Sequence, residues 1–308
     1  MTYTYRWCNF DYETLVTISL YSYILTSICS FVGNLLVILT VYINKNLRTS
    51  TNYFIVSMSV SDILFPLFVL LVSILLDRRV SQVSKLIGNL LCKLLLYIVE
   101  VSMLTLVTIT VYRFFAVMFP MRARVQNKRK RIFVLLLTWV IPMAIWSPFL
   151  VILEFDENDQ TCFYRSKPYY LIWIAADLSL LRLLPLLIML VLYPLIIIKL
   201  MKEKVPGNVH CDQVVIRRRK QNFRLTMMLI VLTVTFLLCW GPHIIHWLLT
   251  LILKLDRCNF FYLFFVAFRI TPVVFHAINP VIYFIFLSSF RQGFKNIFRS
   301  SCCNRTRP

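Results

Sequence analysis

Seven predominantly apolar stretches divide the 308-residue chain, and each is long enough to cross a bilayer as a helix. They lie near residues 20–43, 52–76, 89–114, 131–153, 169–199, 222–253 and 260–287. Because backbone polar groups inside a bilayer must be hydrogen-bonded within the chain, such stretches form helices. The chain is 59% hydrophobic, well above the roughly 45–50% of soluble domains. We therefore predict an all-α membrane protein, a seven-transmembrane helix bundle.

The segments between the stretches are too short to form a second domain. We expect three regions: an extracellular N-terminus at 1–19, the transmembrane domain at 20–287, and an amphipathic helix with a cytoplasmic tail at 288–308. The last region spaces Phe290, Phe294 and Phe298 as on one helix face among basic residues, which is typical of a short eighth helix lying along a membrane. The first twenty residues lack a signal-peptide pattern, so we expect the first stretch to direct insertion.

Basic residues concentrate on one side of the predicted bundle. The segments after the first, third and fifth stretches, and the tail, are rich in Lys and Arg and contain only the acids Glu203 and Asp212. Cytoplasmic loops carry such an excess, so we expect a multi-pass membrane protein with its N-terminus outside. The net charge of +20 then reflects topology and contact with anionic lipid, and no nucleic-acid partner is expected.

Asp62 lies within the second apolar stretch. An ionisable group at mid-membrane costs at least about 2.5–3.5 kcal/mol and indicates a functional site by default. The candidate partners on other stretches are Asn34, Ser102 and Asn279. A carboxylate that faces hydroxyls and amides could hold a water cluster or a small cation. The alternative is a hydrogen-bond network with a purely structural role.

Two prolines predict irregular helices. Pro242 in the sixth stretch cannot donate to the carbonyl one turn earlier, so we expect a kink beside Trp240. Pro280 frees a second carbonyl in the seventh stretch, directly after Asn279. Arg113 ends the third stretch, where snorkelling to the membrane interface would by itself explain an arginine.

Several cysteines lie on the predicted outer, oxidising side. Cys92 opens the third stretch and Cys162 lies in an acidic outer segment, so we expect a disulfide between them. Cys8 and Cys258 are candidates for a second disulfide. On the inner side, Cys302-Cys303 follow the amphipathic segment and are candidate palmitoylation sites.

Taken together, these residues resemble the rhodopsin-like G-protein-coupled receptors. The resemblance covers nearly the whole chain and rests on the order of the motifs: Gly33-Asn34, Asp62, Cys92, Arg113, Trp139, Cys162, Pro185 with Tyr193, Phe236 to Pro242 around Trp240, and Asn279-Pro280 with Tyr283. The family implies a receptor that binds an extracellular ligand and activates heterotrimeric G proteins. Its further partners would be arrestin and membrane lipids. No covalent chemistry is implied, so we do not expect an enzyme.

The resemblance also assigns roles to residues. Asp62, Ser102 and Asn279 look like a buried sodium and water site, and sodium is the one cofactor that this implies. A signalling switch would comprise Phe236, Trp240, Pro242, Arg113, Tyr193, Asn279, Pro280 and Tyr283. An agonist would work by binding the activated state more tightly than the resting state.

Three features depart from the family pattern. Tyr112 stands before Arg113, where an acid is usual, and Asn222 stands where some members offer an acidic partner, so we expect raised basal signalling. A binding or decoy receptor that does not signal is the nearer alternative. Cys92 and Arg113 are about one helical turn closer than usual, and Ser102 falls at the sodium-site position only when counted from Arg113. His276 and Phe275 stand near Asn279 in place of smaller residues, which argues against sodium binding.

The ligand class is narrowed by elimination. Val273 replaces the retinal lysine of opsins, and the third stretch offers an amine no aspartate, only Glu100. We therefore expect a peptide, since the chain looks most like the neuropeptide receptors. The predicted ligand pocket comprises Glu100, Asp177, Arg182, His243, His246, Trp247 and Arg269. Within it, Arg269 could grip the peptide, whereas Arg182 could instead bridge Glu100 or Asp177 for structure.

Two other classes have less support. A seven-helix transporter would show inverted repeats and paired broken stretches around a midplane site, and neither pattern is visible. None of the four histidines lies in a nucleophile or metal constellation. His243 and His246 lie about one turn apart and could ligate a metal, but lining the pocket is the favoured role, so no metal site is predicted.

Overall fold

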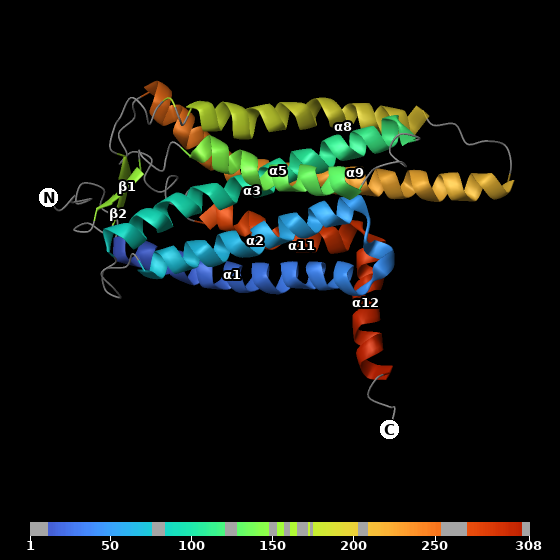
Figure 1. The fold of residues 1–308 in the computed structure, drawn as a ribbon, viewed down its shortest axis with the longest axis horizontal. Helices are drawn as coiled ribbons and strands as arrows, with labels where there is room; N and C mark the ends of the chain where they lie inside the picture. The colour runs from blue at the N-terminus through green and yellow to red at the C-terminus, as the bar shows by residue number, and fades with distance from the viewer. Residues whose placement is uncertain are drawn as a thin grey trace.

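The computed structural model describes residues 12–75, 84–120, 128–147, 153–156, 161–164, 172, 175–202, 209–253 and 270–303. Seven long helices lie side by side along the longest axis of the molecule (Figure 1). They are α1 (Tyr12–Ile43), α2 (Ser50–Leu75), α3 (Lys85–Met118), α5 (Lys128–Trp146), α8 (Leu184–Lys202), α9 (Val209–Leu253) and α11 (Thr271–Phe286). The shorter elements are the 3₁₀ turn η2 (Lys45–Leu47), the hairpin of β1 (Leu153–Asp156) and β2 (Thr161–Tyr164), the π-helical turn η3 (Asp177–Leu183), and α12 (Ser288–Cys303).

Five spans among the described residues are long and apolar enough to cross a membrane: 17–43, 50–75, 100–118, 178–202 and 215–242. The pair of α11 and α12 passes the same test only together, which would make six spans, although the two helices are bent by 95° at their junction. The remaining long helix, α5, begins with four basic residues and then turns apolar.

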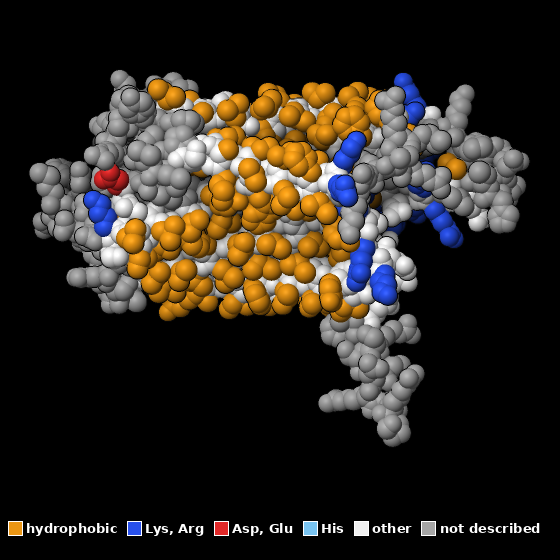
Figure 2. Space-filling model, in the orientation of Figure 1, with side chains coloured by type: hydrophobic (Ala, Val, Ile, Leu, Met, Phe, Trp, Pro, Cys, Tyr) orange, Lys and Arg blue, Asp and Glu red, His pale blue; other side chains and the backbone are white. Residues whose placement is uncertain are grey.

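The flank of the bundle is apolar, as expected of a surface that faces lipid. A broad band of hydrophobic side chains covers the long helices, and Lys and Arg gather at the end where α12 leaves the bundle (Figure 2). Soluble monomers rarely expose such large apolar surfaces. Exposed residues of this kind include Leu71 on α2, Leu136 on α5, Leu190 on α8 and Ile285 on α11. This apolar band agrees with a bundle that spans a membrane.

Proline explains the irregular start of α8. Pro185 lacks an N–H group and its ring would collide with the carbonyl of Leu181 in a regular helix. The turn before it, η3, widens to π-helical geometry, and α8 continues as an ordinary helix. The side chain of Arg182 in η3 is directed to the bundle interior and is only 5% exposed.

The amphipathic α12 turns away from the bundle after Leu287 (Figure 1). Its Phe290 is fully buried, with its ring centroid 6.4 Å from that of Phe284 on α11. Gly293 lies so close to α1 and η2 that an added Cβ would be 2.8 Å from the side chain of Thr40. The carbonyl of Gly293 accepts a hydrogen bond of 3.1 Å from the Asn44 amide. These contacts fix the direction of the predicted eighth helix.

The β1–β2 hairpin packs on the first turn of α3. Phe155, which pairs with Cys162 across the hairpin, is 1% exposed, and its backbone N–H donates to Asn89 Oδ1 at 2.7 Å. The phenyl ring lies against Gly88, where an added Cβ would come within 2.1 Å of it. The hairpin is therefore anchored at the end of α3 that carries Cys92.

Candidate functional site

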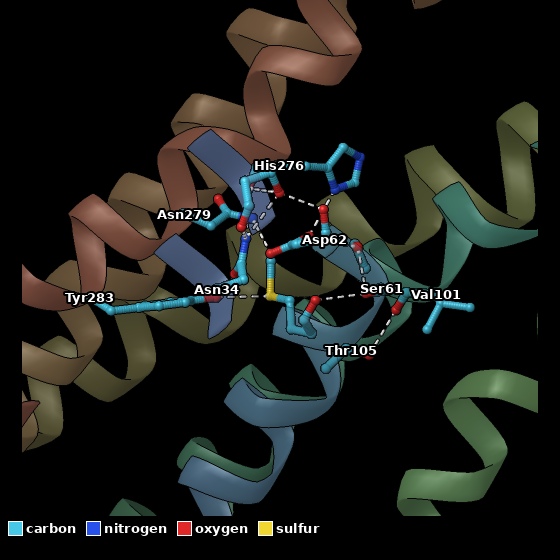
Figure 3. Close-up of polar contacts among 11 residues, drawn as sticks. Asn34, Ser61, Asp62, Val101, Thr105, His276, Asn279 and Tyr283 are labelled. Carbon is cyan, nitrogen blue, oxygen red and sulfur yellow. Dashed lines mark hydrogen bonds and ion pairs between the residues drawn. The ribbon is translucent and has the colours of Figure 1, made fainter. Parts of the chain in front are cut away.

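A buried polar cluster surrounds Asp62 where α2, α3 and α11 meet (Figure 3). Both carboxylate oxygens are occupied. Oδ1 lies 2.8 Å from His276 Nδ1 and accepts a hydrogen bond of 3.1 Å from Ser102 Oγ, while Oδ2 accepts one of 2.9 Å from Asn279 Nδ2. Ser61 extends the cluster, with its hydroxyl 2.9 Å from that of Ser102. All these side chains are buried, so the three helices are joined through one carboxylate.

Helix α1 adds a second layer to the cluster. Ser30 Oγ donates to the Asp62 carbonyl at 2.6 Å, and Asn34 Nδ2 donates to the His276 carbonyl at 3.2 Å. The close approach depends on Gly33, where an added Cβ would be 3.0 Å from the ring of Pro280. The Gly33-Asn34 and Asn279-Pro280 motifs are therefore in direct contact.

Nearer the predicted outer side, an ion pair joins η3 to α3. Arg182 Nη2 lies 2.6 Å from Glu100 Oε1, and both side chains are buried. The Arg182 guanidinium carbon also lies 5.1 Å from the ring centroid of Trp240 on α9, within the range of a cation–π contact. Of the two arrangements considered for Arg182, the structure contains the bridge to Glu100.

Trp240 belongs to an aromatic cluster between α9 and α11. Its ring stacks with that of Phe236 at a centroid distance of 6.0 Å and an interplanar angle of 20°. Phe236 in turn meets Phe275 edge-on at 5.5 Å. Pro242 lies inside α9, two residues beyond Trp240. The predicted switch residues Phe236 and Trp240 are thus packed between Arg182 and the seventh long helix.

Tyr193 joins three of the long helices. Its hydroxyl lies 3.1 Å from Thr110 Oγ1 on α3 and 2.8 Å from Thr233 Oγ1 on α9. It is also 3.2 Å from the carbonyl of Leu229. Because Tyr193 itself belongs to α8, this hydroxyl holds α3, α8 and α9 together.

The other two predicted inner residues have less polar surroundings. The hydroxyl of Tyr283 is fully buried and donates to the sulfur of Met58 at 3.3 Å. Among the described residues, Arg113 Nε and the Tyr112 hydroxyl are buried atoms with no hydrogen-bond partner. The Tyr112 ring packs against Phe54 at a centroid distance of 5.4 Å.

Part of the predicted pocket and all of the predicted disulfides lie outside what the structure describes. Arg269, Cys8 and Cys258 fall outside the described residues. For another set the helix or strand is described but the side chain is not: Cys92, Asp177, Cys162, His243, His246, Trp247, Cys302 and Cys303. Of the predicted pocket, only Glu100 and Arg182 have described side chains. No group of three metal-ligating side chains occurs within the described ranges.

Three residues that contact Asp62 or Tyr193 were not predicted as site residues from the sequence. His276 contacts Asp62 directly, and Thr110 and Thr233 hold Tyr193. A signal for His276 was available, because it lies three residues before Asn279 and so shares its helix face. Nothing in the spacing of Thr110 and Thr233 distinguishes them from other helix-interior threonines.

The structure is a bundle of long helices, most of them apolar enough to span a membrane, with polar and aromatic clusters buried inside it. The family described as "7 transmembrane receptor (rhodopsin family)" matches residues 33–283, and the chain belongs to this family. The predictions of a seven-transmembrane bundle and of a receptor rather than an enzyme are confirmed by this membership.

The relatives point mainly to peptide receptors. Neuropeptide receptor 22 of Caenorhabditis elegans is 28% identical over 88% of this chain and 67% of its own length. Neuropeptide FF receptor 1 of Rattus norvegicus is 28% identical over 92% of this chain and 70% of its own. An octopamine receptor, beta-2R of Chilo suppressalis, is 26% identical over 91% of this chain and 79% of its own.

Proposed function

We propose that this protein is a plasma-membrane receptor that binds an extracellular peptide and activates heterotrimeric G proteins. Its N-terminus would be extracellular, with residues 1–19 outside, 20–287 forming the receptor domain and 288–308 inside the cell. Two of the relatives above are neuropeptide receptors by name, and they cover most of the chain. The peptide would enter the bundle from the end that carries the β1–β2 hairpin.

One observation favours a peptide over an amine. An amine ligand needs an unshared carboxylate, and the one acidic residue of α3 is Glu100. That carboxylate is already 2.6 Å from the Arg182 guanidinium and is buried. A ligand amine would have to displace an internal cation, which carries a large desolvation cost. The octopamine relative is therefore the weaker guide to the ligand.

Signalling would proceed by a shift between two arrangements of the helices. An agonist changes this equilibrium only to the extent that it binds one arrangement more tightly. Trp240 could connect ligand binding to this change of arrangement. Its ring contacts both Arg182 at the ligand side and Phe236 on the same helix. The inner half of α9 would then move and expose Arg113 to the G protein, and arrestin would compete for the same surface.

We further propose raised basal activity. Tyr112 supplies no carboxylate to Arg113, and the Arg113 Nε atom has no hydrogen-bond partner among the described residues. The resting arrangement therefore lacks one ionic restraint. The alternative is a binding or decoy receptor that does not signal, and it is based on the same feature, Tyr112 in place of an acidic residue before Arg113.

Sodium is the cofactor implied by the resemblance, and the residues around Asp62 do not fit it. A hard cation needs oxygen lone pairs directed at it. Among the described residues, the Asp62 carboxylate oxygens meet N–H and O–H groups of His276, Ser102 and Asn279. No step of the mechanism proposed here requires the ion.

The test is G-protein activation in cells that express the chain, measured across the main G-protein classes. Cells are compared without ligand and with pooled amidated peptides, beside an Arg113→Ala variant at matched surface expression. Activity that depends on Arg113 supports a signalling receptor. Peptide binding at the cell surface without activation of any class would favour the decoy receptor.

A further inference from the structure

The signalling steps proposed above do not involve the contact between Asp62 and His276. Both side chains are fully buried, and Oδ1 and Nδ1 are 2.8 Å apart. In the pairing that the contact allows for a carboxylate, which can only accept, Nδ1 is the donor and Oδ1 the acceptor. A buried carboxylate is costly unless its oxygens are satisfied, and here the imidazole, an amide and a hydroxyl satisfy them.

The imidazole packs against two aromatic rings. Its ring centroid lies 4.6 Å from that of Phe65 on α2 and 5.2 Å from that of Phe275 on its own helix. The backbone carbonyl of His276 accepts hydrogen bonds from Asn34 Nδ2 at 3.2 Å and Ser30 Oγ at 3.3 Å on α1. The ring therefore cannot swing away from Asp62 without losing two aromatic contacts, and the backbone that carries it is fixed to α1.

A monovalent cation at Asp62 would need the position that the Nδ1–H group fills. Within the part of the chain that the structure describes, the other hydrogen-bond donors to the carboxylate are the Ser102 hydroxyl on Oδ1 and the Asn279 amide N–H on Oδ2. Both present hydrogens and not lone pairs to the carboxylate. In Figure 3 the imidazole of His276 lies directly over Asp62, between α2 and α11.

We propose that His276 is a built-in substitute for a sodium ion: its N–H group links Asp62 on α2 to α11, and the receptor is consequently insensitive to sodium. The link from α2 to α11 is made by the chain itself. If position 276 carried a small side chain in place of His276, a cation could approach Asp62 Oδ1.

The experiment measures thermal unfolding of the purified full chain in detergent, without ligand, in NaCl and in N-methyl-D-glucamine chloride at equal ionic strength. For the wild type we expect no difference in Tm between the two salts. For His276→Ser we expect a lower Tm in N-methyl-D-glucamine and a rise of about 3 °C or more in sodium, because an ion that binds the folded state stabilises it by mass action.

Further variants make the outcomes decisive. Asp62→Asn combined with His276→Ser should lose any sodium response, and His276→Asn, which keeps an N–H donor, should respond less than His276→Ser. A wild-type Tm that rises in sodium, and does not rise in Asp62→Asn, would overturn the proposal. So would a folded His276→Ser variant that stays insensitive. The readout needs neither agonist nor G protein, so its result is independent of the ligand proposed above.

Discussion

Arg182 on η3 and Glu100 on α3 form a buried ion pair with a nitrogen-to-oxygen distance of 2.6 Å, and the same guanidinium lies 5.1 Å from the ring centroid of Trp240. A residue that could have contacted ligand directly thus serves to hold two helices together beside the predicted switch. Because Arg182 lies within the π-helical turn, the pair joins this turn to α3.

Breaking the pair on one side should be strongly destabilising. Glu100→Gln removes the carboxylate that lies 2.6 Å from the Arg182 guanidinium, and removal of one partner of a buried pair costs about 3–5 kcal/mol. Arg182→Met should cost a similar amount because it removes the cation that faces Glu100. The measurement is Tm of the detergent-solubilised protein together with surface expression.

The control for this pair is the double variant Glu100→Leu with Arg182→Met. Replacing both charges by apolar side chains of similar volume is often neutral, so the double variant should be more stable than either single variant. Strictly additive losses would mean that the two side chains do not depend on one another in the folded protein.

Tyr112→Asp should lower basal G-protein activation. The new carboxylate would adjoin Arg113, whose Nε atom lacks a partner among the described residues, and an ion pair of about 1 kcal/mol present only in the resting state would reduce the active population about fivefold. Tyr112→Phe is the matched control, since it keeps the ring that packs on Phe54. Basal activity is compared at equal surface expression, and equal values for wild type and Tyr112→Asp would count against an unrestrained Arg113.

Tyr193→Phe should reduce stability by a moderate amount. The change removes the hydroxyl that lies 2.8 Å from Thr233 Oγ1 and 3.1 Å from Thr110 Oγ1. Both threonines retain a bond to a backbone carbonyl of their own helix, so we expect a loss of about 1–2 kcal/mol rather than the cost of a fully orphaned group. Thr233→Val tests the same contact from α9, and in the Tyr193→Phe background it should cost little more.

Gly88→Ala should displace the β1–β2 hairpin. A methyl group at this position would come within 2.1 Å of the Phe155 ring, so the ring must leave its pocket. The expected result is a lower Tm and faster proteolysis of the segment around Phe155. Gly241→Ala is the control: it has no heavy atom within 4 Å of the added Cβ, and alanine in a helix interior should stabilise by up to about 1 kcal/mol. If both variants behaved alike, the packing of Phe155 on Gly88 would not hold the hairpin.

The sequence alone did not decide the register of the third long helix. The 21-residue separation of Cys92 and Arg113 left two registers open for Ser102. In the structure Ser102 Oγ lies 3.1 Å from Asp62 Oδ1, which is the register obtained by counting from Arg113. Counting along one helix cannot decide this, because the residue of α3 that faces Asp62 depends on how α3 packs against α2.

The sequence by itself determined the class of fold. In a bilayer every backbone N–H and C=O group needs an internal partner, so long apolar stretches can only be helices. The distribution of Lys and Arg predicts which end of the bundle is cytoplasmic. Which side chains meet was decided only by the tertiary structure. The contacts of Arg182 with Glu100 and of His276 with Asp62 depend on the rotation, tilt and spacing of separate helices. Those quantities follow from packing across the whole bundle, which no local pattern in the chain encodes.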